Sequence, residues 1–312
     1  MRIHTPQQLH AHEAGSDKEP LHLPVLLDQV VELLAPRPGE TYLDLTAGYG
    51  GHAQAIVDRL GDYTSLTLVD RDDNAIAALE PFGSRGSTIV HDDFAHFTES
   101  AVNAGKAFDM VLVDFGVSSP QLDRAERGFS ITRPGPLDMR MDNRLQRTAA
   151  DWVNRATEKE LISIIVLYGE ERPSHAARIA RAIVRSRPHR TTEDLARAVL
   201  STHRGPRAKV HPATRTFQAI RIACNDELAQ IQQLLENTTQ LLNPGGRIAF
   251  ISFHSLEDRL VQQYLSEQTR SGYESTMTLL TKRAILGKTD DVHNPRARSA
   301  ILRAAVKNKK KG

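Results

Sequence analysis

The sequence predicts an α/β fold with a parallel, doubly wound sheet that a block of helices interrupts. In the first third of the chain, short apolar runs alternate with helical patterns, and after Asp114 the strand signals stop for more than a hundred residues. Strands that alternate with helices are typical of parallel sheets, because each helix returns the chain across one face of the sheet. A chain of 312 residues accommodates one large domain or two modest ones.

The first third contains four short apolar runs of the kind that buried strands have, with helical patterns between them. The predicted strands are 41–45, 65–70, 87–92 and 108–116, and the predicted helices are 50–60, 72–82 and 97–106.

The middle of the chain is predicted to be helical, since apolar residues recur three and four positions apart. The predicted helices are 158–171, 173–187 and 191–203, followed by one long amphipathic helix over 214–242 that ends at NPGG. A fifth strand over 247–254, a helix over 255–265 and an antiparallel pair, 275–281 with 299–307, complete the sheet. We therefore expect a polar extension (1–20), a discontinuous Rossmann-like domain (21–119 and 213–306), a helical insert (120–212) and a basic tail (307–312).

Composition narrows the class of protein. Cys224 is the only cysteine, which excludes an internal disulfide and fits a reducing, cytoplasmic setting. The first 20 residues have no apolar core, and no run of about 18 apolar residues occurs, so we expect neither a secretory signal nor a membrane span. The histidines show no metal-ligand spacing, so no metal site is expected. A homo-oligomer stays open.

Positive charge is concentrated in one segment. Eleven Arg or Lys residues and two acidic residues lie between Arg172 and Arg215, although the net charge of the chain is only +2. The tail KNKKKG adds a second basic cluster. Segregated positive charge indicates a polyanionic partner, and a solvated helical face with a disordered tail is the alternative.

A glycine turn joins the first predicted strand to the helix that follows. Gly48, Gly50 and Gly51 allow a tight bend and a close approach of the backbone to a ligand, while the helix points its free N–H groups at the same place. A tight turn without a ligand is the alternative, because a lone glycine pattern is weak evidence.

Acidic residues at the strand ends indicate which ligand the turn holds. Asp70 ends the second strand, where a carboxylate accepts both hydroxyls of a ribose or, alternatively, caps the next helix. Asp44 ends the first strand. The glycine string permits either NAD or S-adenosylmethionine, but a carboxylate at Asp44 suits the positive sulfonium and ammonium groups of S-adenosylmethionine better than a pyrophosphate.

Further candidates follow the third and fourth strands. Phe94 is placed to lie against an adenine face, with Asp92 or Asp93 accepting from an exocyclic amine, or else it is a core residue beside a helix cap. Asp114 and Gln121 are placed to reach a ligand beyond the carboxyl ends of the strands. A buried Asp114 that caps the loop is the alternative.

Several longer motifs occur in order: VSSPQLDRAERGFS, GPLDMRMD, YGEE, HPATRTFQAIRIACNDEL and GGRIAFISFHSLEDR. Together they resemble the signatures of the bacterial RsmH (MraW) family of S-adenosylmethionine-dependent 16S rRNA cytidine N4-methyltransferases. The resemblance runs from about His22 to NPRARSAILRAAVK. It implies a class I methyltransferase domain with an inserted helical domain, S-adenosylmethionine as cofactor, and 16S rRNA in the decoding region of the small ribosomal subunit as substrate.

The resemblance also implies which residues bind the cofactor. The sequence departs slightly from the family at Ala47, where leucine is usual, at Tyr49, where glycine is usual, and at Cys224, where valine is common. Matched by motif, the cofactor-binding residues are Gly50, Gly51, His52, Asp70, Phe94, Asp114 and Gln121.

Candidates on the substrate side are less specific. His254 follows the fifth strand and is a candidate to orient the base or take a proton, or else to brace a loop. Asp138 and Arg140 are candidates for catalysis and substrate binding, with a helix cap or an Asp–Arg pair as the alternative. A last set shares one face of a predicted helix and is expected to contact RNA or to form a salt-bridged surface: Arg178, Arg181 and Arg185.

Three other functions compete with this interpretation. A methyltransferase that acts on DNA or tRNA would use the same cofactor residues. A non-catalytic RNA-binding or assembly protein would keep the fold, although the intact glycine turn, Asp70 and Asp114 argue against lost binding. An NAD oxidoreductase is the third.

Overall fold

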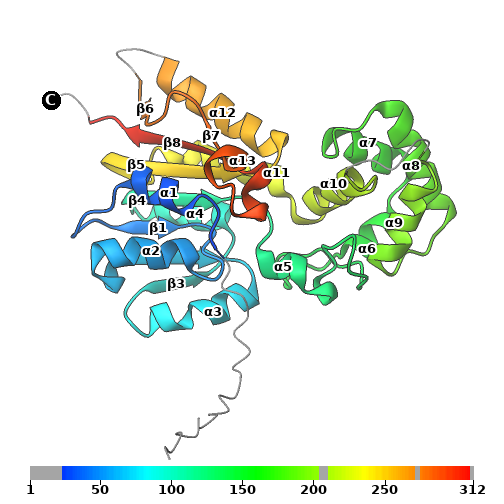
Figure 1. Cartoon of the computed structure of the whole chain (residues 1–312), viewed down its shortest axis with the longest axis horizontal. Helices are drawn as coiled ribbons and strands as arrows, with labels where there is room; N and C mark the ends of the chain where they lie inside the picture. The colour runs from blue at the N-terminus through cyan, green and yellow to red at the C-terminus, as the bar shows by residue number, and fades with distance from the viewer. Residues whose placement is uncertain (1–22, 204–209, 271–274, 310–312) are drawn as a thin grey trace, which may run out of the picture.

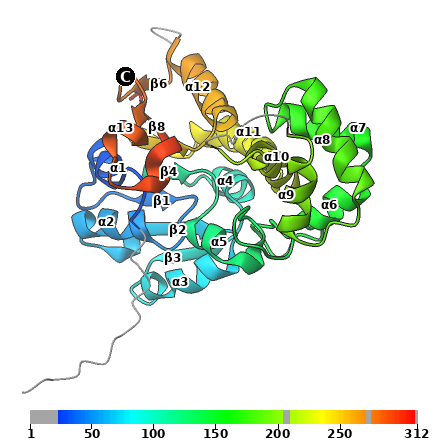
Figure 2. The same ribbon diagram turned by 45° about the vertical axis from the view of Figure 1, so that its right-hand side comes forward.

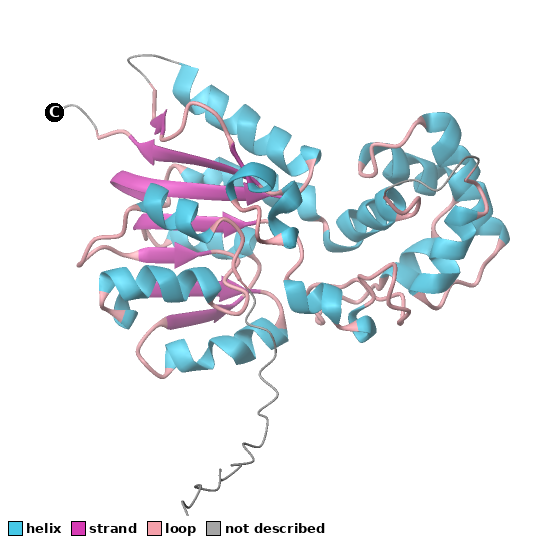
Figure 3. Ribbon diagram, viewed as in Figure 1, coloured by secondary structure: helices cyan, strands magenta, loops and turns pink. Residues whose placement is uncertain are grey.

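The computed structural model describes residues 23–203, 210–270 and 275–309. It shows a sheet covered by helices on both faces and, beside it, a separate group of helices (Figures 1 and 3). The predicted extension, 1–20, lies outside the described residues. Within these ranges no helix combines the length and the apolar character that crossing a bilayer requires.

The sheet has the strand order β3-β2-β1-β4-β5-β8-β6, with β7 paired to β8. The first five strands are parallel, and β8 is antiparallel to its neighbours β5, β6 and β7. The predicted α/β class, the five parallel strands and the closing antiparallel pair are therefore confirmed. The strands are β1 (Tyr42–Asp44), β2 (Leu66–Asp70), β3 (Thr88–His91), β4 (Phe108–Asp114), β5 (Leu242–Ser252), β6 (Met277–Leu279), β7 (Ile285–Leu286) and β8 (Ile301–Lys307).

Alternate residues of the central strands enter two different cores, as the pleat of a strand requires. Met110 and Leu112 of β4 pack beneath α1, α2 and α3, whereas Val111 and Val113 pack beneath α4, α11 and α12. The helix α1 is not among the predicted elements. The covering helices are α1 (Leu27–Leu34), α2 (Gly51–Leu60), α3 (Asp73–Gly83), α4 (Phe94–Asn103), α11 (Glu227–Thr238) and α12 (Ser255–Arg270).

The remaining core belongs to a group of five helices that we call the helical lobe (Figure 2). The run LISIIVLY, 161–168, suits a strand by composition, but Glu158–Leu167 form a helix, and Thr157 and Glu160 close its first turn as a capping box. The lobe consists of α6 (Ala149–Arg155), α7 (Glu158–Leu167), α8 (Pro173–Arg185), α9 (Thr192–Leu200) and α10 (Thr214–Asn225). Two short helices lie outside it, α5 (Ser119–Asp123) and α13 (Gly287–Asp290).

The predicted single helix over 214–242 is wrong. Asp226 adopts a left-handed backbone conformation, with φ of 52°, and this residue ends α10 and begins α11. The break sends the two halves to different cores: Phe217 and Ile220 of α10 pack in the lobe, whereas Leu234 of α11 packs against the sheet. The lobe therefore extends beyond residue 212, and the chain returns to the sheet at α11 rather than at residue 213.

The basic tail also begins later than predicted. Lys307 pairs with Met277 as the last residue of β8, and its Nζ donates to the carbonyl of Leu242 at 2.6 Å. Residues 310–312 lie outside the described part of the chain.

Candidate cofactor and substrate site

The glycine turn between β1 and α2 is tight in two respects. Gly50 has a φ of 78°, in the left-handed region, and a Cβ built there would lie 2.6 Å from the ring of Phe82. A Cβ on Gly51 would lie 2.5 Å from Pro24. Both positions therefore require glycine, and the first turn of α2 starts directly at the carboxyl edge of the sheet. Its first N–H groups have no partner inside the helix and are available to a ligand.

His52 uses its side chain inside the protein. The imidazole is buried, and burial lowers its pKa to about 4, so the ring is neutral and Nε2 donates to the carbonyl of Val25 at 3.0 Å. The neighbouring N–H of Leu26 donates to Asp291 at 2.9 Å. The ring thus holds the segment before α1 against the glycine turn, and a contact between the backbone N–H of His52 and the cofactor stays a prediction.

Asp70 ties the glycine turn to β2. Its two carboxylate oxygens accept from the N–H of Gly48 at 2.8 Å and from the N–H of Asp72 at 2.9 Å. Burial nevertheless raises the pKa of Asp70. The helix-cap alternative for Asp70 is wrong, since Asp72 is the N-cap of α3 and accepts from Asn74. The expected contact of Asp70 with a ribose stays a prediction.

Asp44, Asp70 and Asp114 end the neighbouring strands β1, β2 and β4, and we call them the carboxylate row. Asp44 is 1% exposed, and burial raises its pKa to about 7 even though it accepts from Tyr42 Oη at 2.8 Å and from the N–H of Thr46 at 3.2 Å. Strand pairing places these carboxylates at one edge of the sheet, which is where ligands of parallel sheets bind.

Asp114 is the least satisfied member of the row. Its Oδ1 is buried and has no hydrogen-bond partner among the described residues. Burial raises the pKa of Asp114 well above its ordinary value, and the negative charges of Asp44 and Glu257 raise it further. A buried carboxylate with an unused oxygen is costly unless a donor or a positive charge meets it. The ammonium and sulfonium groups of S-adenosylmethionine provide that charge, so the row fits this cofactor.

Gln121 lies at the same edge but already has two partners. Its Nε2 donates to Asp72 at 2.7 Å, and its Oε1 accepts from the N–H of Ser118 at 2.9 Å. Arg127 also donates to Asp72, at 2.7 Å. Although burial raises the pKa of Asp72, the bonds from Gln121 and Arg127 lower it overall. Asp72 and Arg127 are not among the predicted site residues. Asp72 lies in the run VDRDD, and Arg127 lies in the motif that contains Gln121, so both could have been found there.

Phe94 occupies the first position of α4 and is largely buried. Its ring meets Phe115 edge-on, with 6.0 Å between the centroids, and Asp93 caps the helix beside it. Asp92 accepts from His96 Nδ1 at 2.6 Å. The geometry matches the core-residue alternative, and a contact between Phe94 and an adenine ring stays a prediction.

His254 is held from both sides of its ring. Nδ1 accepts from the N–H of Glu257 at 3.4 Å, and Nε2 lies 3.1 Å from Glu257 Oε1 and 3.4 Å from Arg221 Nη2. Arg221 in turn makes two 2.9 Å bonds to Glu227. His254 therefore braces the turn after β5, and neither ring nitrogen is without a partner.

The same cluster has the spacing of a metal site. Atoms of Glu227, His254 and Glu257 lie within 4.8 Å of one another, and no other group in the described ranges has this arrangement. The guanidinium of Arg221 already provides a positive charge there. Although burial raises the pKa of Glu257, His254 and Arg221 lower it overall. Sequence reasoning missed Arg221 and Glu257, which lie inside the two longest family motifs.

Asp138 and Arg140 form a pair with each other. Arg140 Nε and Nη2 donate to the two oxygens of Asp138 at 2.7 and 2.8 Å, and Nη1 donates to the carbonyl of Leu145 at 2.7 Å. The side chains close the loop that leads into α6. This is the Asp–Arg pair named as the alternative, and the geometry gives no support to a catalytic role for Asp138.

The three arginines of α8 share an exposed face, as the spacing predicts. The buried face of this helix, which includes Ile179 and Ile183, packs in the lobe. Arg181 lies 3.5 Å from Glu158, a contact between two exposed groups that contributes little. Contact of Arg178, Arg181 and Arg185 with RNA stays a prediction.

Comparison with known proteins places this geometry in a family. A model described as the MraW methylase family matches residues 19–308. A relative from Methylococcus capsulatus is 46% identical over 302 residues, covering 90% of this chain and 99% of that protein. A second, from Bradyrhizobium diazoefficiens, is 46% identical over 303 residues and covers 91% of each. Both relatives are named Ribosomal RNA small subunit methyltransferase H.

The raised pKa of Asp44 predicts a specific dependence of stability on pH. Between its ordinary value of 3.8 and about 7, the folded chain keeps a proton that the unfolded chain has lost. The free energy of unfolding of the cofactor-free protein should therefore fall as pH rises through this window, by up to roughly 4 kcal/mol from this residue. Denaturant titrations of the wild type and Asp44→Asn from pH 4 to 8 measure the free energy of unfolding at each pH.

Asp44→Asn should lose the part of this decline that Asp44 contributes, because an amide does not titrate, and should keep the part that the raised pKa values of Asp70 and Asp114 contribute. Asp58→Asn, a change at an exposed position of α2, should keep the wild-type curve. If wild type and Asp44→Asn gave parallel curves, Asp44 would not be the group that holds the proton.

Proposed function

The chain belongs to the MraW methylase family, and on this premise we propose that it transfers a methyl group from S-adenosylmethionine to the N4 amine of a cytidine in 16S rRNA of the small ribosomal subunit. The names of the two relatives support the small-subunit rRNA as substrate, and the motif resemblance supports cytidine N4. The observation that carries the proposal is the carboxylate row beside the glycine turn. A ribosomal substrate supports a cytoplasmic location for the enzyme.

The glycine turn and the carboxylate row would bind different parts of the cofactor. The glycine turn and the start of α2 would offer backbone N–H groups to it, Asp70 would bind its ribose, and Asp44 and Asp114 would meet its positive charge. Bound there, S-adenosylmethionine supplies an electrophilic methyl group. The lone pair of cytosine N4 is delocalised into the ring, so the main task of the protein is to align N4 with the methyl–sulfur bond.

Cys224 supports methylation at an exocyclic nitrogen over methylation at a ring carbon. Methylation through a covalent thiol adduct needs a thiolate. Burial raises the pKa of Cys224, the only cysteine, to about 12, and its thiol contacts the carbonyl of Arg147 at 3.4 Å. The thiol therefore stays protonated, which argues against a thiol adduct and agrees with direct attack by the N4 lone pair.

The proposal is tested by methyl transfer from radiolabelled S-adenosylmethionine to small ribosomal subunits that lack the modification. Naked 16S rRNA, tRNA and DNA serve as parallel substrates, and labelled nucleosides are identified after digestion. We expect label in N4-methylcytidine from the subunits. Label only in tRNA or DNA, or no label from an enzyme that binds the cofactor, would contradict the proposed substrate.

His254 is expected to act as a positioning residue for this reaction. His254→Ala should lower kcat by roughly 10- to 100-fold, because the turn after β5 loses its brace. The affinity for S-adenosylmethionine should stay within about twofold, since His254 is not part of the carboxylate row. Steady-state kinetics on subunits and calorimetry measure the two quantities.

The exposed His293, changed to alanine, provides the matched control and should leave kcat unchanged. A wild-type kcat in His254→Ala would remove His254 from the reaction, and an equal loss of cofactor affinity would show that it serves the cofactor site instead.

A further inference from the structure

The loop between α7 and α8 carries a side chain that reaches from the helical lobe to α12, which covers the sheet (Figure 1). Glu170, in the motif YGEE, accepts from Arg259 Nη2 at 3.0 Å through one carboxylate oxygen and from Ser255 Oγ through the other. We call these three residues the clamp. We propose that Glu170 is a positioning residue, because the clamp fixes the lobe relative to the turn after β5, so that RNA held by the lobe meets the cofactor in one alignment. This inference rests on the proposed function.

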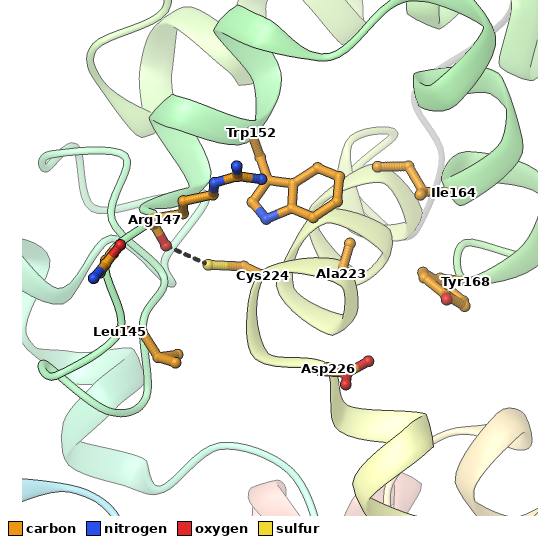
Figure 4. Close-up of a pocket in the computed structure, with 9 residues that line it drawn as sticks. Leu145, Arg147, Trp152, Ile164, Tyr168, Ala223, Cys224 and Asp226 are labelled. Atoms are coloured by element: carbon orange, nitrogen blue, oxygen red, sulfur yellow. Dashed lines mark hydrogen bonds between the residues drawn. The ribbon is translucent and has the colours of Figure 1, made fainter.

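On the lobe side, the loop that carries Glu170 is held tightly. A Cβ on Gly169 would lie 2.6 Å from a carbonyl of α7 and 2.8 Å from the carbonyl of Arg215 in α10, so this position requires glycine. Gln218 Nε2 donates to the carbonyl of Tyr168 at 2.9 Å. Tyr168 also lines a pocket of about 490 Å³ in the lobe (Figure 4). Glu170 is therefore fixed to the inner surface of the lobe.

The backbone of Glu170 is strained. Its φ of 50° lies in the left-handed region, which glycine adopts without a steric penalty and other residues adopt at a cost in free energy. The side chains of Glu170 and Arg259 are 36% and 65% exposed, and an ion pair this exposed contributes little to stability. Strained residues gather at functional sites. The stability of the fold thus gives no reason for a glutamate at this position, whereas the placement of the lobe does.

On the sheet side, the clamp ends at the turn that carries His254. Ser255 directly follows His254 and begins α12, and Arg259 lies about one turn further along, so both donors share one face of the helix. The N-terminal end of a helix also favours a negative charge. Hydrogen bonds from Ser255 and Arg259 lower the pKa of Glu170, so the carboxylate stays charged at neutral pH.

The placement of the lobe affects the reaction because the two reactants would be held by different parts of the chain. The carboxylate row would hold S-adenosylmethionine, and the exposed arginines of α8 would hold RNA. A displacement of the reactants by about 1 Å can lower the rate by about 100-fold. Arg221 of α10, with Glu227 and Glu257, already joins the lobe to the helices of the sheet. The clamp adds a second point of attachment, and two points prevent a rotation that one point permits.

The first test is the single-turnover rate of methyl transfer to unmodified small subunits at saturating enzyme, which separates alignment from binding. Glu170→Ala should lower this rate by roughly 5- to 50-fold, within the limit that a misplacement of 1 Å sets. The enzyme concentration that gives half of the maximal rate should stay within about threefold of the wild-type value, because the surface of the lobe is unchanged. The affinity for S-adenosylmethionine should also keep its wild-type value.

Glu193→Ala is the matched control, because Glu193 forms an exposed ion pair with Arg197 at 2.9 Å, but within α9. It should keep the wild-type rate. The same wild-type rate in Glu170→Ala would overturn the proposal. If Glu170→Ala failed to fold, Arg259→Ala would remove the ion pair from the side of α12 and should show the same loss of rate.

An exchange of charges tests whether the two residues act as a pair. Glu170→Arg and Arg259→Glu each place like charges opposite one another, so each should lower the rate. The double variant restores opposite charges and should return to within about fivefold of the wild-type rate. Losses that simply multiply in the double variant would show that the residues act independently, and would overturn the clamp.

The placement of the lobe can be measured without a substrate. Spin labels on Lys106→Cys, before β4, and Lys159→Cys, on α7, occupy exposed positions and report the distance between sheet and lobe. Cys224→Ala removes the only native thiol. The distance distribution should be narrow in this chain and should broaden when Glu170→Ala is added.

An unchanged distance distribution in the labelled Glu170→Ala chain would contradict the clamp. A broadened distribution, with a wild-type enzyme that methylates no cytidine, would instead keep the clamp and reject the proposed function.

Discussion

The carboxylates that end three neighbouring strands of a parallel sheet are the constraint on which the rest of the structure depends. Parallel strands bring their carboxyl ends to one edge, so Asp44, Asp70 and Asp114 lie close together by topology alone. Burial raises the pKa of each, and the charge of a neighbouring member of the row raises the pKa values of Asp44 and Asp114 further. Burying these carboxylates destabilises the fold at one edge of the sheet, and a positively charged ligand bound there offsets the destabilisation.

The surrounding structure organises this edge and connects it to the helical lobe. Asp70 fixes the glycine turn, and Glu257 connects Asp114 to His254 and Arg221, which lies on α10 of the lobe. A second contact joins the same two parts, since Glu170 at the end of α7 accepts from Arg259 of α12 at 3.0 Å. The lobe that carries the basic helix α8 is thus held against the turn that follows β5. The helical lobe and the edge of the sheet that carries the carboxylate row are connected through these buried or bridging pairs.

Much of the sheet and its glycine turn could be predicted, because strand and helix periodicities are local properties of the sequence. Predicting the end of α10 failed for a physical reason: the amphipathic pattern continues through Asp226, and only a left-handed conformation at that residue divides the helix between two cores.

The partners of site residues were beyond sequence reasoning for a different reason. Motifs identify Asp138, Arg140 and His254 as candidates, but their partners decide their roles, and those partners are set by packing. Asp138 and Arg140 bind each other, and His254 lies between Glu257 and Arg221.

The most direct test of the central claim is calorimetric titration of the protein with S-adenosylmethionine at pH 6.5, in two buffers that differ in ionisation enthalpy. Our account predicts the release of about one proton on binding, because the positive ligand lowers the raised pKa values of Asp44 and Asp114. The Asp44→Asn and Asp114→Asn variants should each release fewer protons when they bind S-adenosylmethionine. Binding of S-adenosylhomocysteine, which lacks the sulfonium charge, should also release fewer protons. Equal apparent enthalpies in the two buffers would mean that no proton is exchanged. That result would contradict the claim that the buried carboxyl groups hold protons until a positive ligand lowers their pKa.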